Sequence, residues 1–272
     1  MSCKFDEGGR FVRLWDAMMS VYSGQISTTQ PADLDRGIAD PLRTAVVVNQ
    51  LIEAGGALGY TFHLSTDFLE LGKARLIARN SGLSPMFDPA VNPNLQSSAF
   101  WMKAVDADGA VMALQGYRMD IAVPSLAEWA LGWMMGLYAR RREMIVPRQG
   151  LPPEHSLTSS IRGKVAYLGE FWVDRHGKKT LSDIFARLGV LLSFIKWNPE
   201  AVWALTSTSM ATRGFMVRAG LAYTEPSFLT WQWSPDGAES EEWIALATRR
   251  HLEFLVAEMT FKEEKYQPSS SR

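Results

Sequence analysis

The stretch Lys164-Val-Ala-Tyr-Leu-Gly-Glu-Phe-Trp-Val-Asp174 decides the fold, together with the basic turn Arg175-His-Gly-Lys-Lys-Thr180 that follows it. The first segment is short, apolar and rich in aromatic residues, which is typical of a β-strand. Residues 181–197 continue as an apolar helix. Cationic side chains and backbone N–H groups therefore lie between a strand end and a helix N-terminus. This arrangement favours the binding of an anion such as a diphosphate.

A second, smaller unit follows with the same order of elements. Ala201-Val-Trp-Ala-Leu205 reads as a short apolar strand, and Thr206-Ser-Thr-Ser209 offers capping side chains for a helix over residues 210–219. Gly220 suits the end of that helix. Two more strands are predicted, over residues 221–223 and 228–233. Alternating strands and helices predict an α/β domain.

The flanking segments predict further elements. Asp106-Ala-Asp-Gly109 supplies the positive φ that a tight hairpin turn needs. The last predicted helix has one largely apolar face, formed by Trp243, Ile244, Leu246, Ala247, Leu252, Leu255, Val256 and Met259. The predictions are a helix from Pro41, a strand over 60–65, a helix over 67–79 ending at Asn80-Ser-Gly82, a hairpin over 100–120, and helices over 126–142 and 239–262.

Composition narrows the classes of partner. With 28 basic and 29 acidic residues the net charge is −1, so no general attraction to nucleic acid or to an anionic membrane is expected. The most apolar stretch, residues 121–138, carries Pro124 and Glu128 and is short for a membrane span. The first twenty residues lack the apolar core of a secretory signal. We therefore expect a cytoplasmic protein that binds neither nucleic acid nor membranes.

Cysteine and histidine usage argues against a metal site. The lone cysteine, Cys3, excludes an intramolecular disulfide and a cysteine-rich zinc site. The histidines have no ligand spacing, and they are His63, His155, His176 and His251. No metal is expected.

The order of elements over residues 60–233 resembles the acetyl-CoA-dependent N-acetyltransferase superfamily, the GNAT fold, most specifically over 167–223. In that family a central strand leads into a pyrophosphate loop, Arg/Gln-x-x-Gly-x-Gly/Ala, which caps a long helix. Here Arg175 matches, Lys178 and Thr180 occupy the two small positions, and Gly177 stands one place early. The glycines let the backbone approach the phosphates; here Lys178 could compensate with a direct charge contact, or the segment could be a solvated basic turn between strand and helix.

The resemblance implies a fold class and a domain plan. The fold would be α/β, with a mixed, mainly antiparallel central sheet flanked by helices. The plan has an N-terminal helical extension over 1–59, an acyltransferase domain over 60–234 with an inserted helix over 126–142, and a C-terminal helix and disordered tail over 235–272. The inserted helix could cover the acceptor site or form a homodimer surface.

The resemblance also implies how acetyl-CoA, or another acyl-CoA, would be held as co-substrate. The backbone of the strand over residues 164–174 would bind pantetheine and polarise the thioester carbonyl through Phe171, Trp172 and Val173. Ser209 stands where the family has an asparagine. The diphosphate would lie on the basic turn, whose residues are Arg175, His176, Gly177, Lys178, Lys179 and Thr180.

Two residues are candidates for proton transfer. Met216 stands where many family members have a proton-donating tyrosine, and a thioether cannot donate a proton. Tyr223 could replace it, or could be an ordinary half-buried strand residue. Glu170 is a candidate base, or else faces solvent or pairs with Arg118 or Lys103 across the sheet. Strand alternation would place Glu170, Trp172 and Asp174 on one face and Gly169, Phe171 and Val173 on the other.

The leading functional prediction is an acyl-CoA-dependent N-acyltransferase that acts on an amine of a small molecule or a protein. The alternative is a non-catalytic ligand-sensing or protein-interaction module on the same scaffold, which the missing glycines and Met216 favour. A third alternative is that the resemblance is accidental. Whether the strand ending at Asp174 and the strand starting at Ala201 diverge tests this last alternative, because the family's cofactor enters where these two strands separate.

Overall fold

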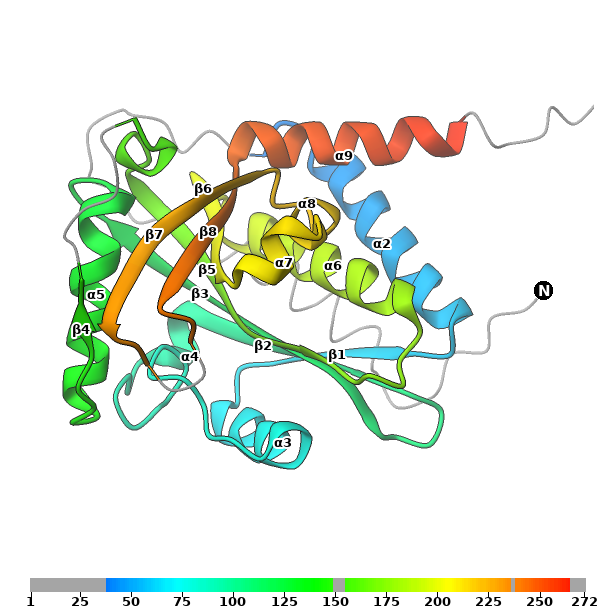
Figure 1. The fold of residues 1–272 in the computed structure, drawn as a ribbon. Helices are drawn as coiled ribbons and strands as arrows, with labels where there is room; N and C mark the ends of the chain where they lie inside the picture. Colours follow the sequence, from blue (N-terminus) through cyan, green and yellow to red (C-terminus); the bar gives the residue numbers. More distant parts are fainter. Residues whose placement is uncertain (1–37, 149–154, 236–237, 265–272) are drawn as a thin grey trace, which may run out of the picture.

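An eight-stranded sheet with helices on both faces organises the chain in the computed structural model, which describes residues 38–148, 155–235 and 238–264 (Figure 1). The strand order is β1-β2-β3-β5-β6-β8-β7-β4, and every neighbouring pair is antiparallel except β5 and β6. The strands are β1 (Thr61–Ser65), β2 (Ala99–Val105), β3 (Val111–Ala122), β4 (Val146–Pro147), β5 (Gly163–Val173), β6 (Ala201–Thr206), β7 (Tyr223–Trp233) and β8 (Glu241–Thr248).

Two apolar layers enclose this sheet. On one face lie α2 (Pro41–Ala57), α6 (Lys179–Trp197), α7 (Thr208–Thr212), α8 (Phe215–Arg218) and α9 (Arg249–Glu264). On the other lie α3 (Phe68–Arg79), α4 (Leu95–Ser98) and α5 (Leu126–Arg140), with the 3₁₀ turn η1 (Leu157–Ser159) beside α5. We call these the α6 face and the α5 face.

Helix α6 is the central helix of the α6 face. Leu181, Phe185, Leu188 and Leu192 recur at helical spacing, and all are buried against the sheet. The helix ends at Asn198, whose φ of 45° is left-handed. Helix α2 packs on α6 through Val47, Val48 and Leu51, so this part of the expected N-terminal extension belongs to the main core.

The predicted fold class is confirmed: the sheet is mixed and mainly antiparallel, with helices on both faces. The helix from Pro41, the hairpin and the stop at Asn80 are also as predicted; Asn80 closes α3 in a left-handed conformation. The predictions for residues 1–37 and for the tail from residue 265 lie outside the described residues.

The helix predicted over 239–262 is wrong in its first half. Residues 241–248 form β8, which inserts between β6 and β7 and pairs with both. A central strand is covered on both faces, so its run from Ile244 to Ala247 is uninterruptedly apolar and resembles a buried helix in the sequence. The main domain therefore extends past the boundary predicted at residue 234. The helix predicted over 210–219 is likewise split into α7 and α8, at Gly214 with a φ of 69°.

Within the residues that the structure describes, no helix is both long enough and apolar enough to cross a membrane.

Two helical glycines offer a matched test of this packing. Gly189 of α6 faces the sheet, where an added Cβ would meet Gln115 and lie 2.5 Å from Cε2 of Tyr117. We expect Gly189→Ala to lower the free energy of unfolding by about 1–3 kcal/mol through overpacking. Gly132 of α5 has nothing within 4 Å of such a Cβ, so Gly132→Ala should raise it by about 0.5–1 kcal/mol. Urea unfolding measures both, and equal effects would contradict the packing of α6.

Candidate active site between β5 and β6

The sheet divides in its middle. Strands β5 and β6 pair in parallel over only three residue pairs, from Val165–Ala201 to Tyr167–Trp203. Beyond that point β5 stays paired with β3 as far as Val173, and β6 stays paired with β8 as far as Thr206. In the described chain, the facing edges of residues 168–173 and 204–206 therefore have no strand partner across the opening (Figure 1). The strands diverge, as the resemblance required.

A β-bulge in β5 lies at the start of the opening. Gly169 pairs with Gly116 and Trp172 pairs with Leu114, so that two β5 residues oppose one β3 residue. Glu170 is the bulged residue, with a φ of 56°. A bulge bends its strand and increases the local twist, which turns β5 away from β6.

The bulge also changes which side chains share a face. Gly169 and Glu170 both face the α5 side, whereas simple alternation predicted opposite faces. A Cβ on Gly169 would lie 2.6 Å from the Phe87 ring, and one on Gly116 would lie 3.0 Å from it. The glycine pair thus provides the space in which Phe87 packs on the sheet.

Glu170 is anchored rather than free. Its side chain is 1% exposed and forms an ion pair with Arg75 of α3, while its Oε1 accepts a hydrogen bond of 2.9 Å from the Ser84 N–H. Burial, followed by the nearby Arg79, lowers the pKa of Arg75 to about 10. The expected partners are occupied elsewhere. Arg118 pairs with Asp120 and Lys103 pairs with Glu70. With both oxygens engaged, Glu170 is poorly placed to accept a proton.

A carboxyl that the sequence prediction missed lies on the same face. Glu242 of β8 directly precedes Trp243, the partner of Thr206 at the end of β6. Its Oε1 accepts a hydrogen bond of 2.7 Å from the indole N–H of Trp231. Desolvation raises the pKa of Glu242 to about 7; the Trp231 hydrogen bond opposes this, and Glu239 adds to it. A carboxyl that titrates near neutrality suits general-base catalysis.

Aromatic side chains pack where the strands part. The ring centroids of Tyr167 and Trp203, the last β5–β6 pair, are 4.7 Å apart. Trp133 of α5 lies against both, at 5.3 and 5.9 Å. On the α6 face, Phe215 of α8 lies 5.2 Å from Phe171 of β5. The opening thus has apolar walls on both faces, which strengthens electrostatic interactions inside it.

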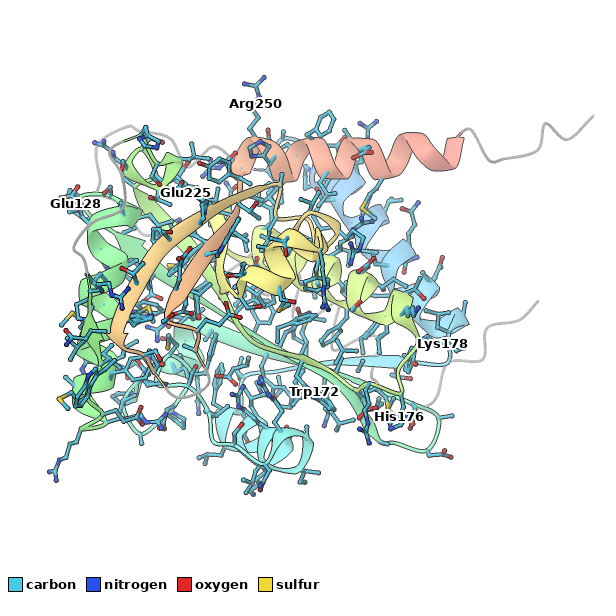
Figure 2. All side chains as sticks on the ribbon, viewed as in Figure 1. Glu128, Trp172, His176, Lys178, Glu225 and Arg250 are labelled. Atoms are coloured by element: carbon cyan, nitrogen blue, oxygen red, sulfur yellow. The ribbon has the colours of Figure 1, made fainter. Side chains whose placement is uncertain are left out.

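Tyr223, the other candidate for proton transfer, lies away from the opening. The Tyr223 hydroxyl donates a hydrogen bond of 2.9 Å to Oε2 of Glu225, which also accepts one of 2.8 Å from Ser156 (Glu225 is labelled in Figure 2). Burial, then the contact with Glu225, raises the pKa of Tyr223. Met216 is buried in the α6-face core, and Ser209 is exposed on α7. Strand β7 is separated from β5 by β8 and β6.

The basic turn leads from β5 into α6 as predicted, but many of its amides are already engaged. The His176 N–H donates to Oδ1 of Asp174 at 2.7 Å, and the Gly177 N–H to the Asp174 carbonyl at 3.0 Å. The Lys178 N–H donates to the Tyr60 hydroxyl at 3.0 Å, and its Nζ to the Leu58 carbonyl at 3.0 Å. Figure 2 labels His176 and Lys178 on this turn, and Trp172 of β5 packs against the α5-face core.

A smaller set of groups remains for a diphosphate. In the described chain the N–H groups of Lys179 and Thr180, in the first turn of α6, have no hydrogen-bond acceptor. The exposed side chains of Arg175 and Lys179 add positive charge there, and Nε of Arg175 donates a hydrogen bond of 3.0 Å to Nε2 of His176. The turn thus fits an anion at the α6 N-terminus, while the Asp174 carboxylate opposes it.

The described residues contain no group of three or more His, Cys, Asp or Glu side chains that could hold a metal ion.

Comparison with known proteins gives similarity in fold only. No protein-family model matches the sequence, and no curated protein matches it. One similar solved structure is FeeM, an N-acyl amino acid synthase from uncultured soil microbes, with 11% identity over 74% of this chain and 97% of that chain and a TM-score of 0.42. A second is Arabidopsis thaliana NAA60 in complex with acetyl-CoA, with 12% identity over 70% of this chain and 98% of that chain and a TM-score of 0.39. A third is the ribosomal-protein-S5-alanine acetyltransferase from Vibrio fischeri, with 11% identity over 70% of this chain and 93% of that chain and a TM-score of 0.40. The similar structures thus include an acetyltransferase by name, but similarity at this level assigns no role to any residue.

The anchoring of Glu170 yields a stability prediction. Glu170→Ala leaves the largely buried Arg75 and the Ser84 N–H without their acceptor, so the free energy of unfolding should fall by about 3 kcal/mol or more. Glu70→Ala is the matched control, since Glu70 joins the same helix to the sheet through Lys103 but is 44% exposed. Its cost should stay below about 1 kcal/mol. Chemical denaturation measures both, and a Glu170 variant as stable as the control would contradict the anchoring role.

Proposed function

We propose that this chain is an acyl-CoA-dependent N-acyltransferase that transfers an acyl group to an amine of a small molecule or a protein. One observation carries the proposal: the sheet divides at a β-bulge, and a carboxyl with a pKa of about 7 lies on the α5 face beside the division. The sequence resemblance supports it independently, because it required the strands to diverge at this place.

The unpaired strand edges suit the arm of an acyl thioester. Pantetheine carries two amide groups, and the edges of residues 168–173 and 204–206 offer backbone donors and acceptors with no strand partner across the opening. An extended ligand can bind such an edge as an added strand does. The diphosphate would then lie at the α6 N-terminus, near Arg175, Lys179 and Thr180.

The reaction needs one proton acceptor. The amine nitrogen attacks the thioester carbonyl carbon, a C–N bond forms and the C–S bond breaks. The proton lost by nitrogen passes to Glu242, and the departing thiolate gains a proton from that carboxyl or from water. In this proposal Glu242 replaces Glu170 as the general base, because both oxygens of Glu170 are engaged.

Acetyl-CoA affinity tests the position of the diphosphate. The Asp174 carboxylate places negative charge at the turn, so Asp174→Asn should lower the Kd about 3-fold. Asp174→Ala also frees the His176 N–H and should lower it at least as far. The double variant Arg175→Ala/Lys179→Ala should raise the Kd about 10-fold. Isothermal calorimetry measures all four proteins. Binding that none of the substitutions alters would exclude the turn as the diphosphate site.

Glu242 should give the activity its pH dependence. A general base acts when deprotonated, so kcat/KM should rise with pH through about 7. Glu242→Gln should remove this step and lower kcat by about 10²- to 10⁴-fold. The assay follows free thiol released from acetyl-CoA over a panel of amines. An unchanged pH profile in the variant would contradict the assignment.

Folding stability gives a second readout for Glu242 that needs no substrate. The carboxyl has a pKa near 4.5 when exposed and about 7 in the folded chain, so its ionised form opposes folding. The penalty is absent below pH 4.5, grows as the pH rises and is complete above about 7. Glu242→Gln should therefore gain stability relative to the original protein between pH 5 and pH 8.

Acetyl-CoA binding without turnover on any amine would favour the sensing module instead.

A further inference from the structure

Tyr167 is placed at the point where the two strands separate. It is the last β5 residue that pairs with β6, and its ring leans along β5 over Gly169. A Cβ on Gly169 would lie 2.9 Å from Cε1 and 3.4 Å from Cζ of the tyrosine ring. The end of the ring that carries the hydroxyl therefore lies beside Gly169 on the α5 face.

The Tyr167 hydroxyl has no hydrogen-bond partner in the part of the chain that the structure describes, although the residue is only 7% exposed. Its surroundings are the rings of Trp203, Trp133 and Phe87, with centroids at 4.7, 5.3 and 6.0 Å. The wholly enclosed polar atoms without a partner in the described residues include the indole N–H groups of Trp133 and Trp203 but not this hydroxyl, so solvent, and hence a ligand, can reach it. An unpaired donor beside a divided sheet is therefore available to a ligand.

The charges around Tyr167 keep its proton in place. Burial is the largest cause that raises the pKa of the phenol, and Glu242 and Tyr138 act in the same direction. Arg118 and Arg75 act against them but do not reverse the shift. The phenol thus keeps its proton at the pH near 7 where Glu242 titrates, and it does not compete with Glu242 for the proton of the amine.

We propose that the Tyr167 hydroxyl donates a hydrogen bond to the thioester carbonyl oxygen and stabilises the negative charge that this oxygen gains during acyl transfer. This inference rests on the proposed function and names a further catalytic residue for it. As the amine nitrogen forms the C–N bond, the carbonyl π electrons move to the oxygen; they return when the C–S bond breaks. Tyr167 keeps its proton throughout, and the amine proton goes to Glu242.

Gly169 is a positioning residue in this arrangement. Any side chain at position 169 would meet both the tyrosine ring and Phe87, at 2.9 and 2.6 Å, so only glycine leaves the phenol where it lies.

The test compares the original protein with Tyr167→Phe in the free-thiol assay. We expect kcat to fall about 10²-fold, as for the loss of one oxyanion donor, with the KM for acetyl-CoA and the pH midpoint near 7 unchanged. The variant should unfold at the same or a higher temperature, since the hydroxyl that it removes has no partner. Tyr117→Phe is the control, because Tyr117 is a buried tyrosine on the α6 face, bonded to Gln115 at 3.2 Å; its kcat should be unchanged.

Infrared spectroscopy provides a readout that needs no amine. The carbonyl stretch of ¹³C-labelled acetyl-CoA should lie at a lower frequency on the original protein than on Tyr167→Phe. Equal frequencies, or a folded Tyr167→Phe that keeps full kcat, would overturn the role of Tyr167 and leave the acyltransferase proposal standing. Failure of the original protein to transfer acetyl to any amine would overturn both.

Discussion

The bend of β5 at Glu170 is the constraint on which the candidate site depends. An extra residue in this strand, held at a φ of 56°, turns its C-terminal half away from β6. The ion pair with Arg75 and the hydrogen bond from Ser84 anchor the bulge to α3 and to the loop after it. A buried charge pair adds little net stability against apolar replacements, but it fixes one geometry because either partner alone is costly.

Small residues around the bulge complete that geometry. Gly116 and Gly169 face each other across β3 and β5, and their missing side chains let Phe87 pack on the sheet. The same absence at Gly169 lets the Tyr167 ring lean toward the bulge. The α5 face of the opening therefore brings together an anchored carboxylate, an unpaired phenol and a carboxyl with a pKa of about 7. Each has a separate role in our account: Glu170 shapes the strand, Tyr167 donates a hydrogen bond to the thioester carbonyl oxygen, and Glu242 accepts the proton of the amine.

The sequence predicted the local elements and their order because capping residues, turn glycines and periodic apolar faces act over a few residues. The hairpin, the helix from Pro41 and the unit from β5 to β6 were all predictable. Strand β8 was not, since a strand covered on both faces has the continuous apolar pattern of a buried helix. That error placed Glu242 on a helix surface. The pairing of Glu170 with Arg75, 95 positions away, left no local signal, and neither did the engaged amides of the basic turn.

Amide hydrogen exchange of the full chain, with and without acetyl-CoA, tests the central claim most directly. The claim is that an acyl thioester binds between the separated edges of β5 and β6. Our account predicts that saturating acetyl-CoA slows exchange in residues 168–173 and 204–206, and that the β2–β3 hairpin, which is paired throughout, changes little. Binding that leaves these edges unprotected, or protects only the exposed surface elsewhere, would contradict the account.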